Sequence, residues 1–340
     1  MSFVLKAIAG IAAWAAMLQS VLAADITGAG SSFAAPIIAK WSATYAASTG
    51  NTVKYQSIGS GSGISEIKAQ AVDFGITDAP LKPRDLQKFA LAQFPLVVGG
   101  IVPVLNVQGI KPGEIHFTGA LLADIFLGKV KTWNDPAIAK LNPGLPLPAT
   151  QIKVVHRSDS SGTTFNWTNY LSKVSPEWQS KVGVGMAVDW PTGAGGRGNE
   201  GVTALVQQAI NSIGYVEYAY VLQNKLVYGL VQNRAGSFVK PGVQSFQAAA
   251  AGADWSKATD FDVVITESPG AQTWPVAATS LVLMPKTPKD SARSRAAINF
   301  FRWALTEGQK QATELEYVPL PPSLVSLIEA YWKSAFATVN

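Results

Sequence analysis

The chain has 340 residues, of which 48% are hydrophobic and 14% are charged. This length and apolar fraction predict a sizeable core in two domains and exclude a disordered chain. The net charge of +5 suits an anionic ligand, but no long Lys/Arg run is present, which argues against nucleic-acid binding. The chain has no cysteine and two histidines, which excludes disulfide frameworks, thiol nucleophiles and most zinc or copper sites.

The first two dozen residues have the features of an export signal. An apolar run follows Lys6 up to Leu18, and small residues end the segment at Ala23 and Ala24. A retained membrane anchor is the alternative, but the run is far shorter than the roughly 20 residues that a membrane span requires. We therefore predict that residues 1–23 are a signal peptide, cleaved after Ala23 or Ala24, and that the mature chain lies outside the cytoplasm.

Short β-branched runs alternate with helical patterns along the rest of the chain, which indicates an α/β fold. Strands are expected at residues 52–55, 72–76, 96–105 and 152–155. Helical spacing of apolar residues predicts core-facing helices around residues 37–45 and 297–304. Two extended runs, residues 95–106 and 274–284, are candidates for strands that cross between two lobes. The first lobe then contains residues 24–98 and 275–340, and the second lobe contains residues 99–274.

Three clusters of small polar residues lie where an extended run gives way to a helical one. They are residues 28–33 (GAGSSF), 59–63 (GSGSG) and 157–164 (RSDSSGTT). Such loops can present backbone N–H groups and hydroxyls to one space, where the helix dipole also favours an anion. For each cluster alone, ordinary capping and turn roles are the alternative.

The coincidence of three clusters predicts an oxyanion site. Arg157 adds a planar set of donors, and Asp159 can orient it. A surface ion pair is the alternative role for Arg157.

Other candidate motifs lack the context that their chemistry needs. Residues 193–198 match G-x-G-x-x-G, but no clear strand precedes them, so we expect a flexible loop ahead of a helix near residues 202–210. His116 has no metal-ligand partner nearby in sequence, and His156 points away from Arg157 in an alternating strand. We expect both histidines to be structural.

Five motifs in order carry a family resemblance. They are TGAGSSF at 27–33, IGSGSG at 58–63, VDFGITDAP at 72–80, RSDSSGT at 157–163 and IGYVEY at 213–218. Together they resemble the phosphate-specific substrate-binding proteins of bacterial ABC transporters, and the likeness runs from about Asp25 to the C-terminus. The resemblance implies a type II periplasmic-binding fold, in which two α/β lobes joined by two crossover strands close on one phosphate ion. It also implies a periplasmic monomer without a cofactor, which delivers phosphate to membrane permease subunits served by a cytoplasmic ATPase.

The resemblance also implies which residues bind phosphate. Ser32 stands where threonine is common in the family and keeps the hydroxyl, whereas His156 stands where a second basic residue is common, which weakens the local positive field. Carried over position by position, the ligands are Ser32, Phe33, Ser60, Asp78, Arg157, Ser161, Gly162 and Thr163, with Asp159 holding Arg157.

Asp78 is an unexpected residue type for an anion site. Phosphate near neutral pH retains an O–H that a carboxylate can accept, whereas sulfate has none and is repelled. From the sequence alone, a helix N-cap before Leu81 is the alternative role for Asp78.

We therefore predict a binding protein that hands phosphate to a permease and is not an enzyme. A secreted phosphatase is one alternative, but it needs a nucleophile with an activating base or a metal cluster, and neither is evident. An extracellular adhesin or phosphate-scavenging protein on the same fold is another, which would share the site but not the transporter.

Overall fold

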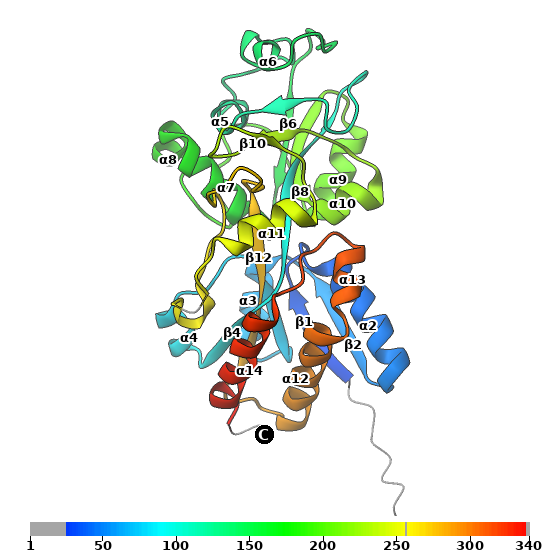
Figure 1. The fold of residues 1–340 in the computed structure, drawn as a ribbon, viewed down its shortest axis with the longest axis vertical. Coiled ribbons are helices and arrows are strands. Elements are labelled where there is room, and N and C mark those ends of the chain that lie inside the picture. The colour runs from blue at the N-terminus through cyan, green and yellow to red at the C-terminus, as the bar shows by residue number, and fades with distance from the viewer. Residues whose placement is uncertain (1–24, 256, 338–340) are drawn as a thin grey trace, which may run out of the picture.

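The computed structural model describes residues 25–255 and 257–337 (Figure 1). The expected signal peptide, residues 1–23, lies outside the described residues. Within them, no helix combines the length and the apolar character needed to cross a bilayer.

One nine-stranded sheet passes through the whole molecule, in the order β2-β1-β3-β12-β4-β8-β6-β7, with β9 paired to β4. Its strands are β1 (Asp25–Gly30), β2 (Thr52–Ser57), β3 (Phe74–Thr77), β4 (Leu91–Asn106), β6 (Lys153–Arg157), β7 (Ala194–Gly196), β8 (Ser212–Glu217), β9 (Val227–Tyr228) and β12 (Ala277–Pro285). A small second sheet joins β5 (His116–Phe117), β10 (Leu230–Gln232) and β11 (Phe238–Val239).

The helices gather in two groups, which we call the first lobe (lower half of Figure 1) and the second lobe (upper half). The first lobe contains α2 (Ala35–Thr49), α3 (Ser60–Lys68), α4 (Pro83–Lys88), α12 (Ser291–Thr306), α13 (Gln309–Glu314) and α14 (Pro322–Ala335). The second contains α5 (Gly119–Phe126), α6 (Pro136–Leu141), α7 (Gly162–Val174), α8 (Pro176–Lys181), α9 (Gly198–Gln208) and α10 (Tyr218–Asn224), while α11 (Val243–Ala251) lies beside the crossing strands. This arrangement confirms the α/β fold class.

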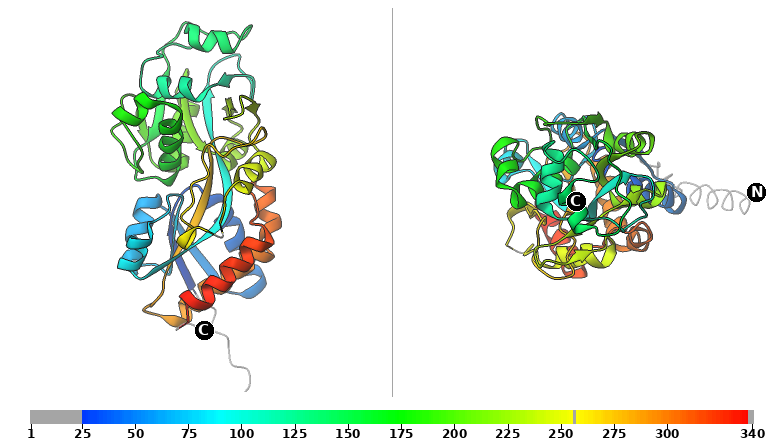
Figure 2. Two further views of the ribbon diagram at one scale, coloured as in Figure 1. Left: turned by 60° about the vertical axis from the view of Figure 1, so that its left-hand side comes forward. Right: turned by 90° about the horizontal axis from the view of Figure 1, so that it is seen from above.

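Strands β4 and β12 run side by side from one lobe to the other (Figure 2). They pair antiparallel from Leu91 opposite Pro285 to Gly100 opposite Ala277. Every residue of β12 and all of β4 except Asn106 are buried, as expected for strands covered on both faces. The two extended runs expected to cross between lobes therefore do so.

The short 3₁₀ helix Thr259–Phe261 packs against the first lobe, although it belongs by sequence to the range expected for the second. Asp262 forms an ion pair with Lys82 at 2.9 Å, and Tyr331 Oη donates to Asp260 at 2.9 Å. These contacts connect residues 259–262 to parts of the chain that are far away in sequence. The lobe boundaries stay a prediction.

The helical periodicity is confirmed where apolar side chains were expected to face the core. Ile37, Ile38, Trp41 and Tyr45 of α2 are buried, with Pro36 in the first turn. In α12 the buried side chains include Ala297, Phe300, Phe301 and Ala304.

The glycine-rich clusters are more ordered than the sequence predicts. Residues 28–30 lie in strand β1, not in a loop, because they pair with β2 on one side and with β3 on the other. A side chain on Gly28 would collide with the ring of Phe74 from β3. Ser60 to Gly63 form the first turn of α3, entered from Gly59 at a φ of 89°.

The expectation of a flexible loop at residues 193–198 is also wrong. Residues 194–196 form β7, which pairs with β6, and α9 begins at Gly198 instead of near residue 202. The pattern does not follow a strand as a dinucleotide site requires, because β7 lies inside it: Gly193 precedes β7, Gly195 lies in it and Gly198 begins α9.

Candidate functional site

The three small polar clusters meet between the lobes. Gly61 N, at the start of α3 in the first lobe, donates to Ser160 O in the second at 3.0 Å. A methyl group on Gly162, the first residue of α7, would lie 2.5 Å from Ser60 Oγ and 2.7 Å from Asp78 Oδ2. The predicted side chains with polar atoms are at most 3% exposed, namely Ser32, Ser60, Asp78, Arg157, Ser161 and Thr163. We call this group of residues the interlobe site.

Asp78 forms the acidic part of the interlobe site. It follows β3, and two hydroxyls hold its carboxyl group: Ser31 Oγ donates to Oδ2 at 2.5 Å, and Ser280 Oγ donates to Oδ1 at 2.6 Å. Burial raises the pKa of Asp78 to about 6, against the lowering effects of these hydroxyls and of the Arg157 charge. The helix-cap alternative is wrong, because α4 begins at Pro83 and the Asp78 side chain turns into the interior.

Arg157 forms the basic part. It ends β6, and its side chain is 1% exposed. Nε and Nη2 donate to the two carboxylate oxygens of Asp159 at 2.8 and 2.5 Å. Burial opposes ionisation of Asp159, but the hydrogen bonds and charge of Arg157 hold the pKa of that carboxyl below its usual range. Arg157 and Asp159 therefore form an ion pair, and the alternative of a surface pair is wrong because the Arg157 side chain is buried.

The start of α7 contributes neutral groups. Ser161 is the N-cap, and its Oγ accepts from Thr164 N at 3.0 Å. The first N–H groups of a helix have no partner inside it, so Gly162 and Thr163 present amides at the positive end of the helix dipole. Thr163 Oγ1 lies 3.4 Å from Arg157 Nη1, which joins this helix start to the basic part.

The first cluster faces the second lobe directly. Ser32 Oγ accepts from Asn199 N at 3.0 Å and from Asn199 Nδ2 at 2.9 Å. Phe33 N donates to Ser31 Oγ at 3.0 Å. The lobes are thus closed on each other in this structure.

Sequence reasoning missed several residues that build the site. Ser280 is a polar residue within an apolar crossing strand, which is a usable signal because buried polar groups need a partner. Asn199 follows a glycine-rich segment and carries no motif signal. Tyr215 lies in the IGYVEY motif, and its hydroxyl accepts from Arg157 N at 3.2 Å.

The histidines lie outside the interlobe site. His156 stacks on Trp190 with ring centroids 4.7 Å apart, and burial lowers its pKa. His116 stacks on Phe238 at 4.5 Å. Both contacts fit structural roles. In the part of the chain that the structure describes, no group of three or more His, Cys, Asp or Glu residues could hold a metal ion.

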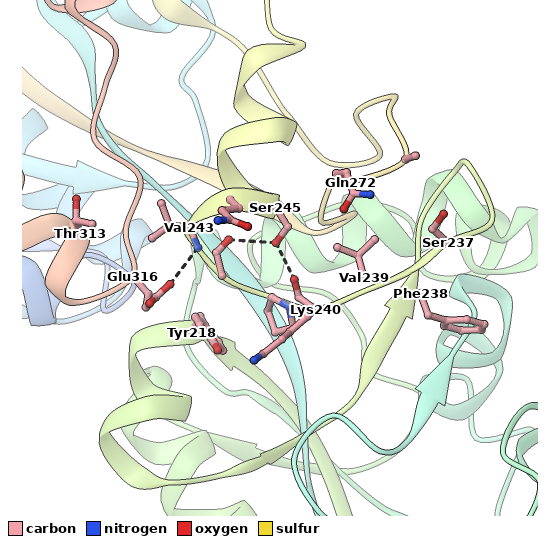
Figure 3. A pocket seen from close by; sticks show the side chains of 14 residues that line it. Tyr218, Ser237, Phe238, Val239, Lys240, Val243, Ser245, Gln272, Thr313 and Glu316 are labelled. Carbon is pink, nitrogen blue, oxygen red and sulfur yellow. Dashed lines mark hydrogen bonds between the residues drawn. The ribbon is translucent and has the colours of Figure 1, made fainter.

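A cavity of about 720 Å³ lies elsewhere, beside the start of α11 (Figure 3). Glu316 accepts from Val243 N at 3.0 Å there, and Ser245 Oγ donates to Lys240 O at 2.9 Å. None of the predicted phosphate ligands lines this cavity.

Comparison with known proteins identifies the family. A family model described as a PBP superfamily domain matches residues 19–307. The chain is 59% identical over 311 residues to the phosphate-binding protein PstS of Xylella fastidiosa (strain Temecula1), covering 92% of this chain and 85% of that protein. The chain belongs to the PstS family of phosphate-binding proteins. The PstS of Pasteurella multocida is a further relative, 54% identical over 92% of this chain and 91% of its own length.

Solved structures show the fold of the PstS family at lower sequence identity. A phosphate-binding protein from Stenotrophomonas maltophilia matches with a TM-score of 0.68 at 18% identity, covering 91% of this chain and 94% of its own. A putative phosphate ABC transporter substrate-binding protein with bound phosphate from Clostridium perfringens matches with a TM-score of 0.65 at 17% identity, covering 87% and 100%. The type II periplasmic-binding fold implied by the five motifs is therefore confirmed, as is the family resemblance.

Proposed function

We propose that this chain binds inorganic phosphate in the periplasm and delivers it to the permease of a phosphate ABC transporter. One observation carries the proposal: the buried Arg157 of the second lobe, paired with the part-buried Asp159, lies close enough to the buried carboxyl of Asp78 in the first lobe for its charge to act on it, among helix starts. The names of the relatives, which are phosphate-binding proteins, support it.

Donors from both lobes would surround the anion. Burying an anion is unfavourable unless its oxygens receive hydrogen bonds. Hydrogen bonds that involve a charged group contribute on the order of 1.5–3 kcal/mol each, so one arginine with several neutral donors can offset the loss of water. The proposed ligands are Ser32, Phe33, Ser60, Asp78, Arg157, Ser161, Gly162 and Thr163, with Asp159 positioning Arg157.

Asp78 would test the ligand for a proton. With a pKa of about 6, its carboxyl group is ionised at neutral pH and can only accept hydrogen bonds. Phosphate still carries an O–H at that pH and can donate it. Sulfate cannot, so its oxygens would face a carboxylate without a proton between them.

Binding and release would require the lobes to part and close. Contacts such as Asn199 to Ser32 span the closed interface, so they must break before an ion can enter. X-ray scattering of the mature protein should show compaction when phosphate is added, and identical profiles would count against closure.

Calorimetric titration of the purified mature chain with phosphate, sulfate and arsenate tests the proposal. We expect saturable binding of phosphate and far weaker binding of sulfate. A chain that shows no response to phosphate would overturn the proposed function.

Two further measurements separate the alternatives. Delivery predicts phosphate-dependent transport when the protein is added to membranes that contain the permease and its ATPase, whereas a scavenging or adhesive protein would give none. A phosphatase would turn over a chromogenic phosphate ester. We expect no turnover, because binding and release involve no chemical step.

Fractionation of cells tests the proposed location. It should recover the chain from the periplasm, as a monomer without its first 23 or 24 residues.

A further inference from the structure

Glu217 is a buried acid that the interlobe site does not use. It ends β8 within the IGYVEY motif and is 0% exposed. Its backbone pairs with Ile101 of the crossing strand β4. Its Oε1 faces Gly99 of the same strand, where a methyl group would lie 3.1 Å away. Glu217 therefore lies where β4 passes from one lobe to the other.

The hydrogen bonds of Glu217 require a proton on its carboxyl group. Tyr317 Oη lies 2.7 Å from Phe33 O and 3.0 Å from Glu217 Oε2. A carbonyl oxygen can only accept, so the single hydroxyl proton of Tyr317 goes to Phe33. The bond between Tyr317 and Glu217 then needs a proton that the carboxyl group supplies.

The two oxygens of the carboxyl group have different surroundings. Oε2 accepts from Ala219 N at 2.7 Å as the N-cap of α10, a bond that favours the ionised form, whereas Oε1 is buried without a hydrogen-bond partner among the described residues. An ionised oxygen in that position would be far more costly to bury than the carbonyl oxygen of a neutral acid.

Burial outweighs the groups around Glu217 that favour a negative charge. It raises the pKa of Glu217 well above its usual range, with a further contribution from the charge of Asp78, against the lowering effect of hydrogen bonds to Ala219, Tyr317 and Tyr218 at the start of α10. The titratable groups that interact with it come from several elements: Asp78 after β3, Tyr218 and Tyr220 on α10, and Tyr317 after α13. Glu200 on α9 and Arg157 on β6 act on the neighbouring Tyr220.

Glu217 also connects the two lobes through its backbone. Its N–H donates to Asn199 Oδ1 at 3.0 Å, which leaves Asn199 Nδ2 to donate to Ser32 Oγ. Its side chain reaches Phe33 through Tyr317. Both paths run from the second lobe to the predicted phosphate ligands of the first.

We propose that Glu217 is a positioning residue that carries a proton. As a neutral acid it joins the lobes through Tyr317 and Phe33 and so stabilises the closed interlobe site. The effect on phosphate rests on the proposed function, whereas the protonation of Glu217 does not.

Infrared spectroscopy of the phosphate-free protein tests the proton directly. At pH 8 Asp78, with a pKa of about 6, is ionised, so a protonated carboxyl band at that pH must come from another acid. We expect such a band in the wild type and in Glu314→Gln, which changes an exposed glutamate. We expect Glu217→Gln to lack it. An identical band in Glu217→Gln, or none in the wild type, overturns the proposal.

Phosphate titration tests the positioning role. Glu217→Ala and Tyr317→Phe should each weaken binding by about tenfold, the effect of losing one hydrogen bond. Glu217→Gln should bind phosphate more tightly than Glu217→Ala but more weakly than the wild type, because its amide can donate to Tyr317 at any pH but the same nitrogen cannot accept from Ala219 N. A glutamine variant as weak as the alanine variant contradicts the inference. Failure of the wild type to bind phosphate would instead overturn the proposed function and leave the infrared result standing.

Discussion

The two lobes bring carboxylates into the interlobe site in opposite electrostatic settings. Asp159 of the second lobe is paired with the guanidinium of Arg157, and its pKa is lowered. Asp78 of the first lobe is held by two hydroxyls, and burial raises its pKa to about 6. The Arg157 and Asp159 charges cancel, so the site has no net positive charge at neutral pH. On the proposed function, anion binding here would depend on hydrogen-bond donors and helix starts, and Asp78 would sense the proton of the ligand.

Removing the cation from the second-lobe half of the interlobe site should have the largest effect on anion binding. Arg157→Ala removes charged donors and leaves the part-buried Asp159 without its cationic partner, so phosphate and sulfate binding should both weaken by on the order of 100-fold or more. Calorimetry measures this, with Arg84→Ala as a control, because the Arg84 side chain is 88% exposed. A loss of less than about threefold would exclude the proposed role of Arg157.

Removing the charge from the first-lobe half should change selectivity instead. Asp78→Asn provides an amide that can donate to sulfate, so the preference for phosphate over sulfate should fall by on the order of 100-fold. Arg157→Lys should change this ratio much less, since it alters the binding of both anions alike. Competition titrations give both ratios, and an unchanged ratio in the asparagine variant would contradict the proton-sensing role.

The same variant should be more stable without phosphate. Burial holds the pKa of Asp78 at about 6 instead of 3.8, so the ionised carboxyl lowers the free energy of unfolding. Asp78→Asn should raise that free energy at pH 8 by on the order of 2 kcal/mol, since one pH unit corresponds to about 1.4 kcal/mol. The gain should be small below pH 4, grow up to about pH 6 and stay constant above it. Denaturant unfolding at several pH values measures it, and a gain independent of pH would point to another cause.

The smallest expected effect is on the pH dependence of sulfate binding. As the pH falls through about 6, Asp78 gains a proton and can donate it to sulfate. The ratio of wild-type affinity to Asp78→Asn affinity for sulfate should be about tenfold higher at pH 5 than at pH 7.5. The asparagine variant has no such proton to gain and therefore serves as the reference. A constant ratio between the two proteins would show that Asp78 does not titrate near its expected pKa.

Local patterns were sufficient for much of the architecture. Alternating β-branched runs located β2, β3, β4 and β6, and helical spacing identified the buried face of α2. The five motifs identified the family and brought three helix starts together as one site. These features depend on residues close together in the chain, and near neighbours determine periodicity, capping and turns.

Other features depended on residues far apart. Residues 28–30 form a strand because they pair with β2 and β3, and Ser280 reaches Asp78 from a crossing strand some 200 positions away. Asn199 had no sequence signal, because only closure places it on Ser32.

The sequence by itself determined the fold class, the family and the chemical character of the interlobe site, since these follow from local pattern and residue type. Only the tertiary structure decided the ionisation of Asp78 and Glu217. A pKa depends on burial and on neighbouring charges, and both arise when distant segments pack together.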